Sequence, residues 1–357
     1  MQVNRRHFIE QAALTAAGAV AGGAMAVAAT PQDSGTQRRQ TRIKGRVVKT
    51  IDLHAHCVIP EAMGLIAGAV ANPSSLVVGP ERLMHMNAQG IDVQVLSINQ
   101  FWYEADRDTA RRVVDLQNHR LAEICAAQPD RFVPLATVAL QYPDLAAEQL
   151  DFAVRSLGMR GVSIAAHVVN DELSAPRFHP FWAKAEALGT VVFIHPQAIP
   201  ELRSRLQGNG GLANVIGNPL DTTIALSHLI FEGTLDDFPG LAICAAHGGG
   251  YLGSYSARSD HGCFAAPGAN CAKQLKKHPS EYLKQIHVDS IVFTSEALRH
   301  LVAEFGADRI VLGTDYPYPW NPTAVDHILE TPTLSDADRV SILSGNAARL
   351  LRIPQSL

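Results

Sequence analysis

The chain has 357 residues, of which 47% are hydrophobic and 18% are charged, and its formal net charge is −4. This composition is far from that of a disordered protein and allows a large core. No basic stripe runs along the sequence, so nucleic acid is not expected as a partner. The length fits either two domains or one large domain.

The first thirty residues differ in kind from the rest. The run Asn4-Arg5-Arg6-His7-Phe8 resembles the twin-arginine export motif, and an apolar stretch rich in Ala and Gly follows from Ala12 to Ala29. The end of this stretch offers small-residue cleavage sites. A membrane-spanning helix is the alternative, but the many Ala and Gly residues make the stretch weakly hydrophobic. We therefore predict a cleaved signal over residues 1–30, no stable membrane anchor, and a periplasmic or secreted protein.

Residues 31–46 are rich in Pro, Gln, Ser, Thr, Arg and Lys, and this composition predicts a polar linker. No C-x-x-C pair occurs among the five cysteines, so a structural zinc site is not indicated. Cys263 and Cys271 lie in one polar loop, and they could pair in an oxidising compartment.

Short apolar runs alternate with helical periodicity from Val47 onward. The runs are rich in Val and Ile, as buried parallel strands are. They are Val47–His56, Val93–Asn99, Phe132–Val138, Gly161–Val168, Val191–Pro196, Ala242–Gly248, Ile286–Ile291 and Ile310–Pro317. The helical stretches include Thr109–Gln128, Leu145–Leu157, Phe178–Leu188 and Thr222–Asp237. Eight strands favour an α/β fold with a closed (β/α)₈ TIM barrel over residues 47–357, with a doubly wound sheet as the alternative.

Polar residues gather at the predicted C-terminal ends of five strands. They are His54 and His56 after the first strand, His167 after the fourth, His195 after the fifth, His247 after the sixth and Asp315 after the eighth. In a barrel these ends converge on one mouth, where active sites are built. Any one of them alone could be an ordinary hydrogen-bonded residue, but together they predict a functional site.

Three imidazoles and one carboxylate in this set predict a metal site. His54 and His56 are two residues apart on a strand, so both side chains point to the same face. Together with His195 and Asp315 they suit Zn²⁺, and also Mn²⁺, Fe²⁺ or Co²⁺. The fourth predicted strand carries no Lys or Glu that could bridge two ions. We therefore expect one divalent metal, with zinc favoured.

His247 is the candidate for proton transfer. It precedes Gly248-Gly249-Gly250, which lets the backbone pass close to a ligand. We interpret His247 as the acid or base that handles the proton of a metal-bound water, with a fifth ligand or a structural hydrogen bond as alternatives. A protonated Asp315 is a second possible proton donor. Two interpretations of His167 remain open. It supports the metal ligands from behind, or it only packs against its neighbours.

At this point the sequence resembles a known family. It is similar to the decarboxylase branch of the amidohydrolase superfamily, and in particular to the α-amino-β-carboxymuconate-ε-semialdehyde decarboxylases. The resemblance covers roughly residues 47–352. It is densest in the runs Gly-Asn-Pro-Leu-Asp-Thr-Thr at 217–223, Ala-His-Gly-Gly-Gly at 246–250, His-Gly at 261–262 and Leu-Gly-Thr-Asp-Tyr-Pro at 312–317.

The resemblance implies a role for several residues. It assigns the metal to His54, His56, His195 and Asp315, and catalysis to His247. It also implies a homodimer in which Arg258 reaches the neighbour's active site and binds a carboxylate of the small-molecule substrate.

Other positions depart from the family pattern. The loop Pro60–Pro80 lacks the family's second carboxylate-binding arginine, and Gln197 and Tyr318 replace aromatic residues of the family. The substrate is therefore expected to carry one recognised carboxylate, with Tyr318 in contact with it. Trp102 and Tyr103 are candidates for an aromatic wall, with ordinary packing as the alternative.

Three functions remain to be weighed. The first is a carbon–carbon lyase that removes CO₂ from an aromatic or unsaturated carboxylic acid. The second is a hydrolase of an amide, ester or lactone that uses the same metal. The third is a non-catalytic metal-binding scaffold, against which the complete ligand set and His247 argue.

Overall fold

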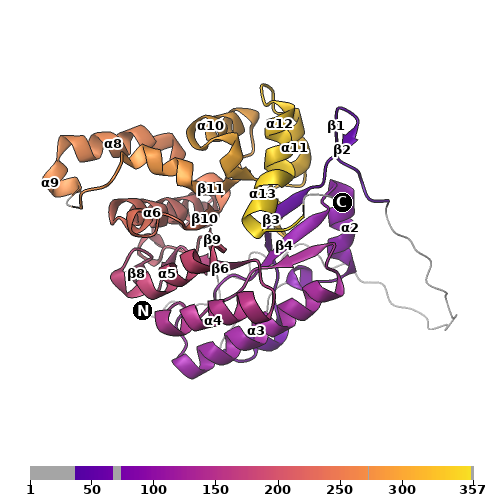
Figure 1. Cartoon of the computed structure of the whole chain (residues 1–357), viewed down its shortest axis with the longest axis horizontal. Coiled ribbons are helices and arrows are strands. Elements are labelled where there is room, and N and C mark those ends of the chain that lie inside the picture. The colour runs from indigo at the N-terminus through magenta and orange to yellow at the C-terminus, as the bar shows by residue number, and fades with distance from the viewer. Residues whose placement is uncertain (1–36, 67–73, 272, 355–357) are drawn as a thin grey trace. The chain divides into compact units, whose positions relative to one another are not determined.

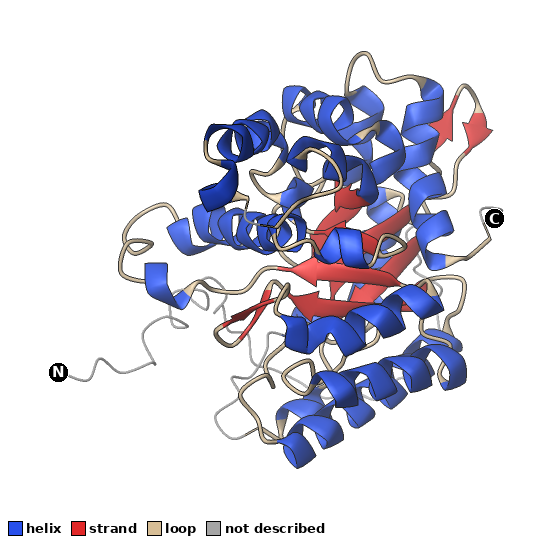
Figure 2. Ribbon diagram, turned by 60° about the vertical axis from the view of Figure 1, so that its left-hand side comes forward, coloured by secondary structure: helices blue, strands red, loops and turns tan. Residues whose placement is uncertain are grey.

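Parallel strands alternate with helices along the residues that the computed structural model describes, which are 37–66, 74–271 and 273–354. The predicted signal, residues 1–30, lies outside these residues. Figure 1 shows the helices packed around the strands, and Figure 2 shows the strands enclosed between helices.

Two sheets make up the barrel wall. One has the strand order β13-β3-β4-β5, formed by Gly313–Tyr316, Ile51–His56, Val93–Ser97 and Phe132–Pro134. The other has the order β12-β11-β10-β9-β6, formed by Ile310–Val311, Ile286–Asp289, Ala242–Ala245, Val191–His195 and Gly161–Ala165.

The two sheets meet at both edges, so the strands form a ring. A parallel bridge joins Ala136, just beyond β5, to Val162 of β6. At the other edge the backbone N–H of Leu53 donates to the carbonyl of Leu312, between β12 and β13, at 2.9 Å. With every pairing in the ring parallel, this is the predicted (β/α)₈ barrel.

The helices follow the strands in chain order. They are α1 Pro60–Met63, α2 Pro80–Gln89, α3 Arg107–Ala127, α4 Pro143–Ser156, α5 His179–Leu188, α6 Asn218–Phe231, α7 Thr234–Asp237, α8 Ser256–Ala265, α9 Pro267–Asn270, α10 Ser295–Phe305, α11 Ala324–Glu330, α12 Asp336–Val340 and α13 Asn346–Leu351. Two π-helical turns, Ala213–Gly217 and Ser341–Gly345, precede α6 and α13.

Local chemistry sets several of these boundaries. The carboxylate of Asp106 accepts from the backbone N–H groups of Asp108 and Thr109, which caps the start of α3. The predicted helix Thr222–Asp237 is divided into α6 and α7 because Gly233 adopts a left-handed conformation with φ 77° between them.

Part of the predicted linker is structured. Strands β1 (Arg42–Ile43) and β2 (Arg46–Val47) form an antiparallel hairpin. Its turn residues, Lys44 and Gly45, have positive φ angles of 48° and 80°, as a tight hairpin requires. Just before the hairpin, Arg39 is paired with Asp326 of α11. Residues 37–46 are therefore docked on the barrel, which composition alone did not indicate.

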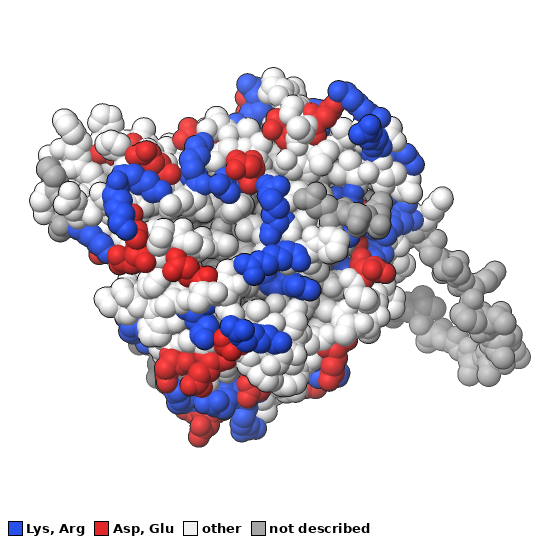
Figure 3. Space-filling model, viewed as in Figure 1, with Lys and Arg blue, Asp and Glu red and all other residues white. Residues whose placement is uncertain are grey.

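Three further observations bear on the expectations above. Cys263 and Cys271 form a disulfide, with Cα atoms 5.2 Å apart. None of the described helices combines the length and apolarity needed to cross a membrane. Basic and acidic side chains are interspersed on the face seen in Figure 3.

Candidate metal centre

Four strands bring the predicted ligands together at their C-terminal ends. His54 and His56 close β3, His195 closes β9, Asp315 lies on β13, and His247 follows β10 at one residue's remove. The Nε2 atoms of His54 and His56 are 3.0 Å apart. The Oδ1 atom of Asp315 lies 2.9 Å from Nε2 of His56 and 3.2 Å from Nε2 of His54.

The spacing of these atoms fits a single divalent ion. One nitrogen or oxygen from each of His54, His195, His247 and Asp315 falls within 4.8 Å of the others. The His56 ring packs against His195 with centroids 4.5 Å apart, so the fifth side chain belongs to the same cluster. Neutral imidazoles and a carboxylate are donors that Zn²⁺ and Mn²⁺ accept.

Burial and mutual charge perturb the whole cluster. Burial alone would lower the pKa of His54, but Asp315 and Asp289 outweigh it and raise that pKa to about 10. Burial lowers the pKa of His56 to about 4 and that of His195 well below its usual value. Although burial opposes it, the surrounding histidines hold the pKa of Asp315 well below its usual range. A buried carboxylate that stays ionised is suited to a cation.

Asp289, at the end of β11, orients the centre. Its Oδ2 atom lies 2.6 Å from Nδ1 of His54 and accepts the backbone N–H of His247 at 2.8 Å. Its Oδ1 atom accepts the N–H of Gly248 at 2.9 Å. A proton held on Nδ1 leaves Nε2 of His54 free to bind metal. Asp289 was not predicted as a site residue, although it lies near the end of the predicted strand Ile286–Ile291 and closes β11.

A buried hydrogen-bond network joins the two strands that carry most of the ligands. Asp52 of β3 accepts from the backbone N–H of Thr314 at 3.0 Å and from its hydroxyl at 2.6 Å. Asp52 also accepts the backbone N–H of His54 at 3.2 Å and the amide of Gln94 at 2.8 Å. It therefore fixes β3 against β13, on which Asp315 lies.

Arg82 of α2 extends this network from behind. It is only 1% exposed. Its guanidinium donates to the carbonyl of His56 at 2.5 Å and to Oε1 of Gln94 at 2.8 Å, and it stacks 4.4 Å above the ring of Tyr316. Among the described residues it has no carboxylate partner. Arg82 therefore contacts the backbone of His56, one candidate ligand, and the ring of Tyr316, the neighbour of another, a role that the sequence did not reveal.

The turn after β10 holds His247 in an uncommon conformation. His247 itself has φ 54°, and Asp315 across the site has φ 60°. Non-glycine residues rarely adopt such angles, and they persist where the surroundings impose them, often at functional sites. The Nε2 atom of His247 is 3.6 Å from Oδ2 of Asp315, and the side chain of His247 is 13% exposed, more than those of His54 and His56. This geometry keeps both the ligand and the proton-transfer role possible.

The candidate substrate residues divide into two groups. The ring of Tyr318 lies 5.9 Å from that of His56, beside the metal cluster. Trp102 instead is fully buried and donates its indole N–H to the carbonyl of Val138 at 3.0 Å. The expectation that Trp102 forms an aromatic wall is thus corrected in favour of packing. Its neighbours Phe101 and Tyr103 line a cavity in its place.

Arg258 and His167 lie at the periphery. Arg258 is exposed on α8, and it forms no ion pair with any residue that the structure describes. Nε2 of His167 is buried without a hydrogen bond and lies 4.0 Å from Oδ2 of Asp221, a carboxylate that accepts the backbone N–H of Gln197. His167 is thus connected through Asp221 to the segment that follows His195.

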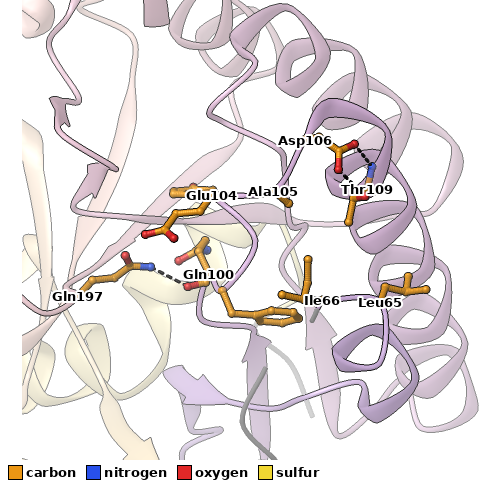
Figure 4. Close-up of a pocket in the computed structure, with 10 residues that line it drawn as sticks. Leu65, Ile66, Gln100, Glu104, Ala105, Asp106, Thr109 and Gln197 are labelled. Atoms are coloured by element: carbon orange, nitrogen blue, oxygen red, sulfur yellow. Dashed lines mark hydrogen bonds between the residues drawn. The ribbon is translucent and has the colours of Figure 1, made fainter. Parts of the chain in front are cut away.

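A cavity of about 580 Å³ is lined by residues that follow the C-terminal ends of β4 and β9. Its walls come from the segment after β4, the first turn of α3, the end of the α1 loop, and Gln197 beyond β9 (Figure 4). The strands β4 and β9, which precede two of these wall segments, also reach the metal centre. The hydroxyl oxygen of Ser97, at the end of β4, lies 3.2 Å from Nδ1 of His56, and His195 ends β9.

The fold and the cluster together define an α/β-barrel protein with a buried histidine–aspartate metal site at the barrel mouth. The model of a family described as amidohydrolase matches residues 51–353. A 2-amino-3-carboxymuconate-6-semialdehyde decarboxylase from Dictyostelium discoideum is 32% identical over 273 residues, which is 76% of this chain and 75% of that protein. The chain therefore belongs to the amidohydrolase family.

Solved structures lead to the same branch. A 5-carboxyvanillate decarboxylase from Sphingomonas paucimobilis is similar with a TM-score of 0.80 and 26% identity, covering 86% of this chain and all of that one. A dihydroxybenzoic acid decarboxylase from a Polaromonas species, solved with manganese and the inhibitor 2-nitroresorcinol, has a TM-score of 0.73 and 26% identity, covering 85% and 97%.

Proposed function

We propose that this chain is a metal-dependent carbon–carbon lyase that removes CO₂ from an aromatic or unsaturated carboxylic acid. The observation that carries the proposal is the cluster of His54, His56, His195 and Asp315 at the barrel mouth, in a chain whose relatives are decarboxylases. A cavity lined by residues that follow β4 and β9, the second of which ends in His195, gives an aromatic ring room to bind.

One divalent ion per chain fits the buried charge. Asp52, Asp289 and Asp315 are at most 5% exposed and together carry three negative charges, and the buried Arg82 carries one positive charge. A divalent cation would offset the negative charge that remains in this buried cluster. The donor set favours zinc, and manganese is the ion of the Polaromonas relative. Metal analysis after reconstitution should give a ratio near one, whereas a reproducible ratio of two would contradict the proposal.

The chain's own residues supply the other parts of the reaction. When bound, the metal supplies a Lewis acid that polarises an oxygen of the substrate. Tyr318 packs along the ring. The bond between the ring carbon and the carboxylate breaks, its electron pair stays on the carbon, and CO₂ leaves. His247, or Asp315 once it has accepted a proton from the substrate, then delivers a proton to that carbon.

A homodimer with a shared active site is part of the proposal. The cation of Arg258 has no described ion-pair partner, so it is free to bind a substrate carboxylate of a neighbouring subunit, and guanidinium–carboxylate pairs are bidentate and strong. Close to Arg258 in the sequence, Tyr255 and Phe264 are 60% and 85% exposed. Large exposed apolar side chains of this kind are typical of a surface that another chain covers.

The test separates a lyase from a hydrolase. The metal-loaded protein is incubated with aromatic monocarboxylic acids and, in parallel, with esters, lactones and amides, while CO₂ release and substrate loss are followed together. We expect CO₂ from the acids, and a loss of about 10²–10⁴-fold in rate with retained metal in His247→Ala. Turnover of the second group without CO₂ from the first would overturn the proposal.

Export through the twin-arginine route is a separate proposal. Arg5 and Arg6 precede an apolar stretch, and the Cys263–Cys271 disulfide is typical of an oxidising compartment. Replacing both arginines with lysine should leave the uncleaved protein in the cytoplasm. If the unaltered chain is found uncleaved in the inner membrane, the apolar stretch is an anchor instead.

A further inference from the structure

The first turn of α6 bonds to two segments of the metal centre. The helix connects β9, which ends in His195, to β10, which is followed by His247. Asp221 and Thr223 stand two residues apart in α6. Because about 3.6 residues make one helical turn, their side chains project to nearly opposite sides of the helix. One can therefore reach the chain after β9 while the other reaches the turn after β10.

Asp221 holds the chain just after His195. Its Oδ2 atom accepts the backbone N–H of Gln197 at 2.7 Å, and the residue is only 4% exposed. Pro196 lies between the two and has no N–H, so Gln197 provides the first backbone donor beyond the ligand. The bond to Asp221 therefore fixes the direction in which the chain leaves His195.

Thr223 holds the far end of the turn that carries His247. Its hydroxyl oxygen accepts the backbone N–H of Tyr251 at 2.7 Å. At the start of the same turn, Asp289 accepts the N–H groups of His247 and Gly248. The turn is thus held at both ends by side chains that belong to other elements.

His247 needs this support because its backbone conformation is unfavourable. A φ of 54° lies in the left-handed region, where a non-glycine residue persists only if its surroundings impose it. Gly250 packs against α6 as well, since a Cβ added there would lie 2.1 Å from the carbonyl oxygen of Pro219. Without the Thr223 hydroxyl, the N–H of Tyr251 would lose its acceptor and the end of the turn could relax.

We propose that Asp221 and Thr223 are positioning residues, of which Asp221 orients His195 for the metal and Thr223 keeps His247 directed at the metal centre. The first turn of α6 is then a shared support for two parts of the site, although neither residue is a candidate ligand. The role of Thr223 rests on the proposed function, in which His247 transfers a proton.

Zinc affinity tests the Asp221 contact. Asp221→Ala removes the acceptor of the Gln197 N–H, so the zinc dissociation constant, measured by competition with a chelator, should rise about tenfold. Asp221→Asn keeps an oxygen that can accept the same N–H, and it should retain most of the affinity.

The ring signal of His247 tests the Thr223 contact. In zinc-loaded protein with isotopically labelled histidine, the NMR signal of its Cε1–H group is identified by its absence in His247→Ala. Thr223→Val keeps the shape of the side chain and removes the hydroxyl, so this signal should shift by more than its linewidth. Thr223→Ser, which keeps the hydroxyl, should leave the signal close to its original position.

Thr222→Val is the matched control for Thr223→Val. The hydroxyl of Thr222 donates to the carbonyl of Asn218 within α6, as that of Thr223 donates to Pro219. The described hydrogen bond of Thr222 lies within the helix, so its loss should not move the His247 signal. On an acid that the unaltered protein decarboxylates, Thr223→Val should lower kcat about tenfold or more at unchanged KM, because a misplaced proton donor slows the step after binding.

The outcomes separate this proposal from the proposed function. Zinc affinity and the NMR signal need no substrate, so both effects should be seen even if no acid releases CO₂. An unmoved His247 signal in Thr223→Val, an equal shift in Thr222→Val, or a shifted signal with unchanged kcat would overturn the role of Thr223.

The role of Asp221 has its own contrary results. They are unchanged zinc affinity in Asp221→Ala and an equal loss of affinity in Asp221→Asn. Loss of the fold in Asp221→Ala or Thr223→Val would also overturn the proposal, because it would make the turn a support of the whole barrel.

Discussion

Arg82 is a cation placed where a cation is costly. It is buried and lacks a carboxylate partner among the described residues, and it is held by the His56 carbonyl, the Gln94 amide and the Tyr316 ring. Buried arginines usually pair with an acid. Here the nearest balance comes through Gln94, which bridges the guanidinium to Asp52. Arg82 thus contributes to the shape of the metal centre without touching the metal.

Arg82→Met should therefore weaken metal binding. We expect the metal dissociation constant to rise about 10- to 100-fold, as it does when groups supporting a ligand are removed. Competition with a chelator measures it, and Arg155→Met on the surface of α4 serves as the control. A lower unfolding temperature with unchanged metal affinity would show that Arg82 is only structural.

Asp221 gives a prediction about pH. Burial raises the pKa of its carboxyl to about 6, although the N–H of Gln197 opposes the shift. A pKa raised above the unfolded value favours folding below pH 3.8, and this contribution is lost as the pH rises through 6. Asp221→Asn should therefore be more stable than the unaltered protein at pH 7.5, by about 3 kcal/mol.

The advantage of Asp221→Asn should disappear near pH 4. Denaturant unfolding of the metal-free protein at both pH values measures the difference, with the exposed Asp130→Asn as control. An equal effect of Asp221→Asn at both pH values would contradict the assignment.

At the scale of elements, the turn after β10 leaves no room for a side chain at Gly250. A Cβ atom added at Gly250 would lie 2.1 Å from the carbonyl oxygen of Pro219, and its φ of 66° is unfavourable for other residues. Gly250→Ala should destabilise the protein by more than about 2 kcal/mol and displace His247.

Gly262 on α8 is the matched control for this change. Nothing lies within 4 Å of a Cβ added there, and it has a helical backbone, so Gly262→Ala should be neutral or slightly stabilising. Thermal unfolding and the rate of CO₂ release measure both variants. An active Gly250→Ala of unchanged stability would contradict the argument.

The strands were predictable from sequence because each is a short, buried apolar run. This pattern does not depend on which elements pack against the strand. The clustering of the candidate ligands was predictable because polar residues stand at the ends of such runs. Asp52 and Gln94 were not, since a single polar residue inside a strand carries no sign of its partner. The hydrogen bonds that explain them join residues 42 and 262 positions apart. The prediction that Trp102 lines the substrate pocket was wrong, because the sequence does not distinguish an aromatic residue in a pocket wall from one in the core.

For the whole molecule, the shared active site predicts complementation. His247→Ala lacks the proposed proton donor and Arg258→Ala the proposed carboxylate contact, so each homodimer should be inactive. A mixed dimer would contain one site with both residues intact, and up to half the activity of the unaltered dimer should return. The measurement is CO₂ release after subunit exchange. No recovery despite verified exchange would contradict a shared site.

The closure of the barrel between β3 and β13 has a consequence for biosynthesis. His56 and Asp315 are 259 positions apart, yet their side chains touch. Because a chain is made from its N-terminus, the carboxylate is added only after most of the protein has left the ribosome. A nascent or truncated chain can offer histidines but not the full donor set. Retention of metal would therefore distinguish a finished molecule from an interrupted one.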